Sequence, residues 1–172
     1  MNASSDTLKL LILCTGNSAR SILGEAIANR DGKGRIQAWS AGSYPKGRVH
    51  PQALALLARH GYPTGGLRSK SWDEFTGGGA PAFDAVITVC DNAAGDTCPV
   101  WLGHPVRVHW GIADPASATG DEAAVVQAFE RAYQVLKGRI DKLAWLPLDS
   151  LDPPSLKRAL DEIGRSDGAA TA

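Results

Sequence analysis

The chain lacks several features that would indicate other classes of protein. Of its 172 residues only three are cysteine, an odd number that is too small for a disulfide framework. Lysine plus arginine and aspartate plus glutamate both total 18, so a formal net charge of zero gives no general attraction for nucleic acid or for an anionic membrane. Any anion that the chain binds must be held by a local site.

Long apolar runs are missing as well. The apolar run at 8–13 is too short to span a bilayer, which takes about 20 residues. The opening residues, MNASSD, lack the basic segment of a secretion signal, so we expect a cytoplasmic protein without a membrane partner. In that reducing compartment, cysteines are more often catalytic, redox-active or metal-binding than structural.

Apolar runs alternate with helical patterns along the chain. We expect strands at 8–13, 35–41, 83–89 and 106–110. We expect helices at 21–30, 50–60, 71–75, 121–145 and 155–163. Strands that alternate with helices are typical of an α/β fold, in which helices cover both faces of a parallel sheet to make three layers. Neither a repeat nor a linker divides the chain, which predicts a single domain over 1–172.

A small polar loop follows the first expected strand. It runs from Cys14 to Arg20 and Ser21 follows it, with the sequence CTGNSARS at 14–21. In parallel α/β folds, ligands bind at the carboxyl ends of the strands. The amides of such a loop can point inward around a tetrahedral anion, and the next helix adds the positive end of its dipole. We expect the oxyanion to be bound by Thr15, Gly16, Asn17, Ser18, Ala19 and Arg20.

The two ends of this loop carry the chemistry. Arg20 offers a planar guanidinium that grips two oxygens at once. The same positive field favours a thiolate, so we expect a lowered pKa for Cys14, with Ser21 donating a hydrogen bond to its sulfur. The alternative is that Cys14 is a buried thiol packed as a small hydrophobe. Its position between a strand and a helix favours the catalytic interpretation.

Polar residues also follow two later strands. Cys90 comes directly after the strand at 83–89, and Asp114 lies in the loop after the strand at 106–110. Carboxyl ends of parallel strands meet at one edge of a sheet, so both residues are expected near Cys14. The alternatives are a core residue for Cys90 and an ordinary Asp-Pro turn for Asp114.

These motifs resemble the low-molecular-weight tyrosine phosphatase family. CTGNSARS at 14–21 is similar to its signature loop, WSAGS at 39–43 to the segment after its second strand, and Asp114-Pro115 to its general-acid loop. The resemblance spans residues 8–145, which we take as the core, and leaves a C-terminal extension at 146–172 whose end, from 164, should fray. It implies a four-stranded parallel sheet flanked by helices.

One branch of the family is more similar than the rest, the thioredoxin-coupled arsenate reductases. That branch carries a cysteine pair, which here is Cys90 and Cys98, followed by motifs that match HWG at 109–111 and DPA at 114–116. Phosphatases of the family typically have an aromatic residue at the position of Ala116. The cysteines here are eight positions apart rather than the seven of some relatives.

The resemblance implies a mechanism. Cys14 attacks the arsenic of arsenate, Asp114 protonates the departing oxygen, and Arg20 stabilises the charge on the others. Cys90 then attacks Cys14 and releases arsenite, and Cys98 attacks Cys90 to leave a disulfide for thioredoxin. We expect the segment 91–98, which must rearrange for each exchange, to be the most mobile part of the chain.

The resemblance also implies ligands and side activities. Phosphate or sulfate should compete with arsenate, residual phosphatase activity is expected, and a glutathione-linked reductant stays open beside thioredoxin. Some relatives bind a potassium ion near the loop, and no other cofactor is expected. The matching positions are Asn17, Glu25, Ser40 and Asp73.

Two other functions stay open. A tyrosine phosphatase would use only Cys14, Arg20 and Asp114, and the cysteine pair and Ala116 argue against it. A non-enzymatic oxyanion or redox sensor would use the same loop without turnover, and a candidate acid at Asp114 argues against that. The reductase should lose two free thiols for each arsenate consumed, and neither alternative should.

Overall fold

The computed structural model describes residues 7–90, 99 and 101–166. The predictions for Cys98, for the segment 91–98 and for the tail beyond 166 therefore lie outside the described residues. The strands are β1 (Leu8–Leu13), β2 (Ile36–Ala41), β3 (Ala85–Thr88) and β4 (Val106–His109). The α-helices are α1 (Arg20–Asp31), α2 (Pro51–Arg59), α4 (Glu122–Ala144) and α5 (Pro153–Ser166). Short 3-10 helices are η2 (Trp72–Phe75), η3 (Pro115–Ser117) and η4 (Leu148–Ser150).

The predicted sheet is confirmed. Its four strands are all parallel, in the order β2-β1-β3-β4. The connection after β1 leads to β2 on one side, and the connection after β3 leads to β4 on the other side. The two connections therefore leave the carboxyl ends of β1 and β3 in opposite directions. Such a switch point is where open α/β sheets bind ligands, and the residue after β1 is Cys14.

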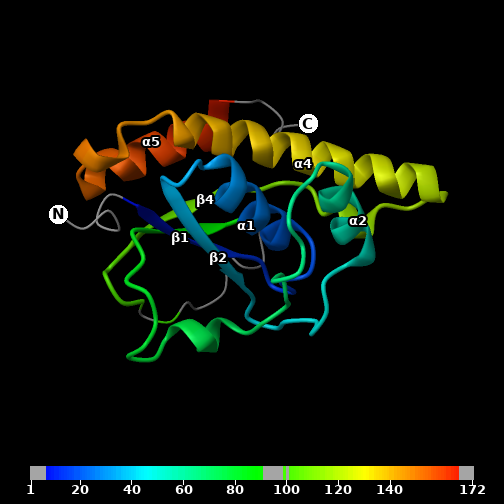
Figure 1. Ribbon diagram of the computed structural model, residues 1–172, viewed down its shortest axis with the longest axis horizontal. Coiled ribbons are helices and arrows are strands. Elements are labelled where there is room, and N and C mark those ends of the chain that lie inside the picture. The colour runs from blue at the N-terminus through cyan, green and yellow to red at the C-terminus, as the bar shows by residue number, and fades with distance from the viewer. Residues whose placement is uncertain (1–6, 91–98, 100, 167–172) are drawn as a thin grey trace.

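Alternate residues of β1 face two unequal cores, because successive side chains of a strand point to opposite faces. Leu10 and Ile12 belong to the larger core, which α1, α2, α4 and α5 also line. Leu11 and Leu13 belong to a smaller core that contains Phe75 of η2. Helices α1, α4 and α5 lie along one face, and η2 is the described helical element on the other (Figure 1). The predicted three-layer arrangement is confirmed, but the layer that contains η2 is thin.

Most predicted helices end within two residues of the expected positions, and side chains mark several starts. Asp121 accepts a hydrogen bond from the amide of Ala124 at the start of α4, and Ser71 accepts one from Asp73 at the start of η2. The loop expected at 111–120 contains η3, which the sequence analysis missed. Among the described residues, no helix is long and apolar enough to cross a bilayer.

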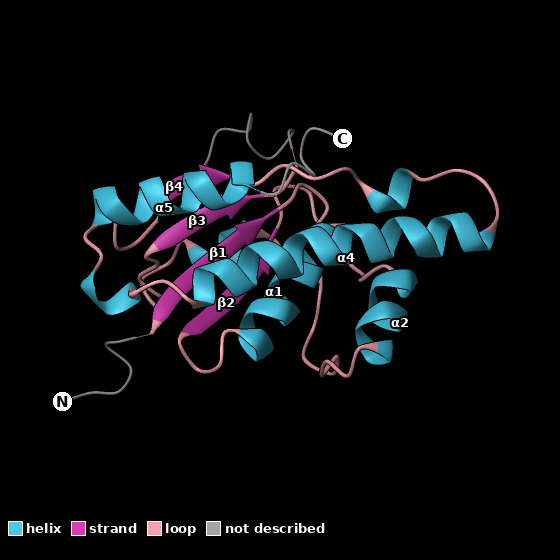
Figure 2. Cartoon of the chain, turned by 90° about the horizontal axis from the view of Figure 1, so that it is seen from above, coloured by secondary structure: helices cyan, strands magenta, loops and turns pink. Residues whose placement is uncertain are grey.

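The C-terminal extension completes the larger core. Helix α5 lies beside β4 at the edge of the sheet (Figure 2). Leu160 of α5 is fully buried, and its carbonyl oxygen accepts a hydrogen bond from the indole nitrogen of Trp110 over 2.9 Å. The expectation of fraying from 164 was wrong for 164–166, because Gly164 packs directly against Trp110, so closely that a Cβ would lie 2.8 Å from its ring.

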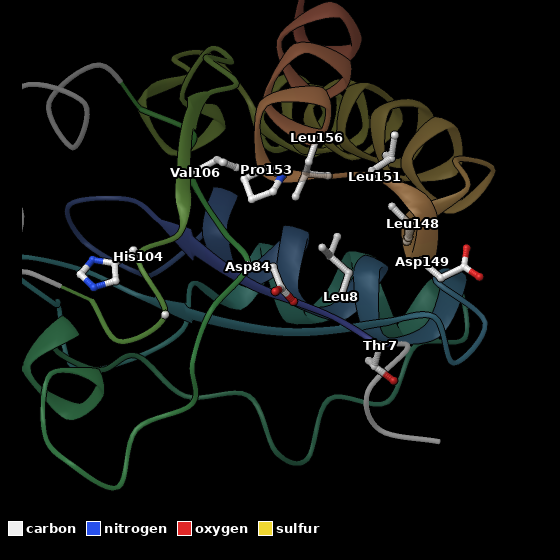
Figure 3. A pocket seen from close by; sticks show the side chains of 11 residues that line it. Thr7, Leu8, Asp84, His104, Val106, Leu148, Asp149, Leu151, Pro153 and Leu156 are labelled. Carbon is white, nitrogen blue, oxygen red and sulfur yellow. The ribbon is translucent and has the colours of Figure 1, made fainter. Parts of the chain in front are cut away.

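A hollow of about 280 Å³ opens at the amino ends of the strands (Figure 3). Asp84 and His104 line it, together with residues from the start of β1 and from the start of α5. The carboxylate of Asp84 accepts a hydrogen bond from the amide of Lys9, so it joins two strands. This hollow lies at the opposite edge of the sheet from Cys14, and we assign it no part in the chemistry.

Candidate active site

The loop after β1 is held in place by backbone hydrogen bonds that its carbonyl oxygens accept. Three of them accept hydrogen bonds of 2.9 to 3.0 Å from backbone amides of the segment 44–50. The backbone just before this segment also lies against the loop, since a Cβ at Gly42 would lie 2.6 Å from the carbonyl oxygen of Cys14 and closer still to that of Thr15. Two of the loop amides already have acceptors, because that of Thr15 donates to Cys90 Sγ and that of Asn17 donates to the carbonyl oxygen of Cys14. That the loop amides surround an anion stays a prediction.

Arg20, the first residue of α1, faces the same centre. One terminal nitrogen of its guanidinium donates to the carbonyl oxygen of Ile112 over 3.0 Å, and the other lies 3.6 Å from Asp114 Oδ2. Among the described residues, its buried Nε has no hydrogen-bond partner. A buried donor without a partner is unfavourable. The orphaned Nε is therefore the donor that a bound anion would satisfy.

A small cavity of about 60 Å³ lies between these groups. It is lined by Cys14, Gly16, Asn17, Ser18, Ala19, Arg20, Lys46, Asp114 and Ala116. One water needs about 10–15 Å³ of such space, so the cavity has room for a tetrahedral oxyanion but not for a large organic group. The predicted loop residues other than Thr15 therefore meet the acid around one small space.

The second cysteine meets the first. The thiols of Cys14 and Cys90 are in hydrogen-bond contact, and both side chains are buried. The backbone amide of Thr15 donates to Cys90 Sγ over 3.3 Å, and its hydroxyl lies 3.6 Å from the same sulfur. The end of β3 thus brings a second sulfur to the nucleophile, as the strand order predicted.

The expected lowering of the Cys14 pKa was wrong for this conformation. Its pKa is raised well above the ordinary value, chiefly by the hydrogen bond with Cys90 and then by burial, both of which favour the protonated thiol. Arg20 and the amide of Gly16 act in the opposite direction. The loop and the arginine favour a lowered pKa, and the neighbouring thiol of Cys90 outweighs them.

Asn17 is the centre of a buried network behind the loop. Its amide nitrogen donates to Ser21 Oγ over 2.8 Å and to Ser40 Oγ over 3.0 Å. Ser40 Oγ donates to Glu25 Oε1 over 2.5 Å, and the amide oxygen of Asn17 accepts from the backbone of Lys70 over 2.9 Å. These bonds hold Asn17 in a left-handed conformation, with a φ of 42°, that a non-glycine residue rarely adopts. Donation from Ser21 to Cys14 stays a prediction.

Three of the four residues expected around potassium therefore meet, namely Asn17, Glu25 and Ser40. The fourth, Asp73, lies in η2, and among the described residues no hydrogen bond or ion pair joins its carboxylate to them. Lys70 comes to Glu25 instead, with its Nζ 3.7 Å from Oε1. No group of three or more His, Cys, Asp or Glu side chains in the described part of the chain could hold a metal ion.

Asp114 both begins a turn and lines the cavity, so its position is compatible with the two roles weighed from the sequence. Its Oδ1 accepts a hydrogen bond from the amide of Ala116 and so begins η3, as a turn residue would. Its Oδ2 faces Arg20, and the side chain is 39% exposed at the cavity mouth. Ala116 puts only a methyl group at that mouth, where the family's phosphatases were expected to have an aromatic ring.

Two lysines near the loop were missed by the sequence analysis. Lys46 lines the cavity, and its side chain lies against Gly16. Its charge also reaches His50, whose pKa is lowered by burial and then by Lys46, while Asp114 opposes the shift. Lys70 is almost fully buried, and burial lowers its pKa despite Glu25. A lone lysine in a loop gives no sequence signal, so neither could have been recognised.

Known proteins resemble this chain over most of its length. The family model for low molecular weight phosphotyrosine protein phosphatase matches residues 9–158, which includes part of the predicted extension. An arsenate reductase of Bacillus licheniformis is 34% identical over 135 residues, which are 78% of this chain and 94% of that protein. An arsenate reductase of Bacillus subtilis is 33% identical with the same coverage.

Solved structures agree. The crystal structure of an arsenate reductase from Archaeoglobus fulgidus has a TM-score of 0.61 at 29% identity, over 78% of this chain and 98% of that one. The structure of an arsenate reductase in the phosphate binding state has a TM-score of 0.65 at 27% identity, over 80% of this chain and 97% of that one. From its matching family model, its relatives and the geometry of its loop, the chain belongs to the low molecular weight phosphotyrosine protein phosphatase family.

Proposed function

We propose that this chain reduces arsenate to arsenite in the cytoplasm by a thiol–disulfide relay, and so serves arsenic detoxification. The observation that carries the proposal is the position of Cys90, whose buried Sγ accepts a hydrogen bond over 3.3 Å from the amide of the residue that follows Cys14. A phosphatase needs one cysteine at this place, whereas a reductase needs a second thiol that can reach the first. The curated relatives named as arsenate reductases support the same choice.

The first step is substitution at arsenic. Arsenate enters the cavity, its oxygens accept hydrogen bonds from the loop amides and the guanidinium of Arg20, and the Cys14 thiolate forms a sulfur–arsenic bond. Asp114 gives a proton to the departing oxygen, which leaves as water. Since the contact with Cys90 favours protonated Cys14, that contact must loosen before attack, which leaves Arg20 and the Gly16 amide to lower the pKa.

The second step moves two electrons. The Cys90 thiolate attacks Cys14 Sγ, a disulfide bond forms, and the electron pair of the sulfur–arsenic bond goes to arsenic, which becomes arsenite. The two cysteine thiols are thereby oxidised and arsenic(V) is reduced to arsenic(III). The contact between the two thiols supports this step, because disulfide partners must have Cα atoms within about 7 Å.

The third step regenerates the nucleophile. Cys98 attacks Cys90, frees Cys14 as a thiolate, and leaves a disulfide between Cys90 and Cys98 that thioredoxin reduces with its own pair of thiols. Phosphate and sulfate compete for the cavity because they are tetrahedral anions of the same charge type. Phosphorus is not reduced, so a phosphate ester yields slow hydrolysis, a residual phosphatase activity.

The test is arsenate-dependent NADPH oxidation with thioredoxin and thioredoxin reductase. We expect many turnovers for the wild type and none for Cys90→Ser or Cys98→Ser, with hydrolysis of a small aryl phosphate retained in both variants. Cys14→Ser is the matched control, because it should lose both activities. Replacement of thioredoxin by glutathione and glutaredoxin tests the reductant. Aryl phosphate hydrolysis without any arsenate turnover would leave a phosphatase.

A further inference from the structure

Lys70 lies in a segment that clamps the oxyanion loop from outside. Its backbone amide donates to Asn17 Oδ1, and its carbonyl oxygen accepts from the amide of Gly42 over 3.0 Å. The preceding residue, Ser69, donates its hydroxyl to the carbonyl oxygen of Gly16 over 3.2 Å. The segment therefore contacts the loop at two points and the Gly42 turn at a third, so the position of Lys70 is fixed by the loop itself.

The ammonium group of Lys70 is buried rather than exposed. Its side chain is 6% exposed, and Nζ donates to the carbonyl oxygen of Arg68 over 2.9 Å and lies 3.7 Å from Glu25 Oε1. The Glu25 side chain is itself only 14% exposed. A buried charge without a partner is strongly unfavourable, so each of these groups requires the other.

The charge of Lys70 reaches the loop through a chain of hydrogen bonds. Glu25 Oε1 accepts from Ser40 Oγ, which accepts in turn from the amide nitrogen of Asn17. The lysine backbone holds the opposite end of the same amide. Lys70 therefore fixes both ends of the side chain that holds the left-handed turn of the loop, one end directly and the other through Glu25.

While Lys70 is in place, the groups around Glu25 do not suit a potassium ion. Cations are bound by oxygen atoms, but Asn17 turns its nitrogen toward Ser40, and its oxygen is occupied by the amide of Lys70. The hydroxyl proton of Ser40 points at Glu25. A cation placed at Glu25 would also lie beside the ammonium group of Lys70 and be repelled.

We infer that the ammonium group of Lys70 is a built-in cation that positions the oxyanion loop through Glu25 and Asn17, so that oxyanion binding is independent of potassium. Lys70 is a positioning residue, since it acts on the loop from behind the cavity. The inference rests on the oxyanion-binding role proposed for the loop, but on none of the reductive steps.

The experiment measures phosphate affinity by calorimetry in choline, sodium and potassium chloride of equal ionic strength. The wild type should bind phosphate equally in all three salts. Lys70→Met should bind about tenfold more weakly in choline and sodium, because buried Glu25 loses its nearest positive partner, and potassium should restore much of the loss. Lys157→Met, which removes an exposed lysine of α5, should match the wild type throughout.

A second variant covers the case in which Lys70→Met does not fold. The double variant Lys70→Met/Glu25→Gln has no buried charge to compensate, so it should fold and its phosphate affinity should not respond to potassium. Wild-type affinity that rises with potassium would overturn the inference, as would a Lys70→Met variant that binds like the wild type in choline. Because phosphate is not reduced, failure of arsenate turnover would refute the proposed reductase and leave this inference standing.

Discussion

The backbone amide of Thr15, the residue after the nucleophile, donates a hydrogen bond to Cys90 Sγ over 3.3 Å. The oxyanion loop at the end of β1 and the second cysteine at the end of β3 are therefore one unit. The same sulfur contacts the thiol of Cys14. Any change at Cys90 should consequently alter the reactivity of Cys14, even where no disulfide forms.

Cys90→Ala should lower the pKa of Cys14, because it removes the largest of the influences that keep the thiol protonated. The thiolate is the reactive form, so the midpoint of iodoacetamide alkylation of Cys14 should move to lower pH. Mass spectrometry of the peptide that contains Cys14 gives the measurement. The double variant Arg20→Lys/Cys90→Ala tests how much the guanidinium of Arg20 contributes to the lowered pKa. A midpoint unchanged by Cys90→Ala would contradict the structure.

Gly42→Ala should destabilise the fold and weaken phosphate binding together, since the new Cβ would collide with the carbonyl oxygens of Cys14 and Thr15. Backbone cannot move aside as a flexible side chain can, so we expect a loss of about 1–3 kcal/mol in the free energy of unfolding. Gly66→Ala is the matched control, with open space around the new carbon, and should change stability by less than about 0.5 kcal/mol. Urea unfolding and a phosphate titration give the two measurements.

The carboxylate of Asp31 should make the free energy of unfolding depend on pH in the acid range. Burial alone would raise its pKa, but hydrogen bonds from Tyr62, Arg30 and Lys137 together lower it below the ordinary value. The unfolded chain keeps a pKa of about 3.9, so the stabilisation is complete above that pH and is lost as the pH falls through the folded-state pKa. Asp31→Asn should therefore be less stable than the wild type at pH 7.

Urea unfolding at several pH values tests the direction of this pH dependence. The difference in unfolding free energy between wild type and Asp31→Asn should shrink as the pH falls from 5 toward 2. Asp149→Asn, which changes an exposed carboxylate in η4, is the control and should leave the pH profile unchanged. A difference that stays constant over this range would show that the partners of Asp31 act through packing and not through its charge.

Leu160→Ala should destabilise the whole domain, because this side chain of α5 is fully buried in the larger core. The expected loss is about 2–5 kcal/mol for a leucine truncated in a core that cannot collapse. Leu102→Ala removes a leucine that is 42% exposed and should cost less than about 1 kcal/mol. Equal effects of the two changes, measured by thermal or urea unfolding, would show that α5 is only loosely attached.

The positions of the strands and long helices were predictable because their hydrophobic patterns are local. The run at 8–13 and the periodic pattern at 121–145 correspond to β1 and α4 with an error of at most one residue. The pattern cannot tell which helix covers which face, however. The sheet therefore proved to have its long helices on one side, and residues 153–166 proved to be part of its core.

The sequence by itself predicted the polar loop after β1, since a cysteine, five residues and an arginine stand between a strand and a helix. It also placed Cys90 and Asp114 at the same edge, because parallel strands end together. Only the tertiary structure decided the raised pKa of Cys14 and the buried pair of Lys70 and Glu25. Both depend on distances between side chains far apart in the chain, and the charge of a residue in the sequence does not reveal what will lie beside it.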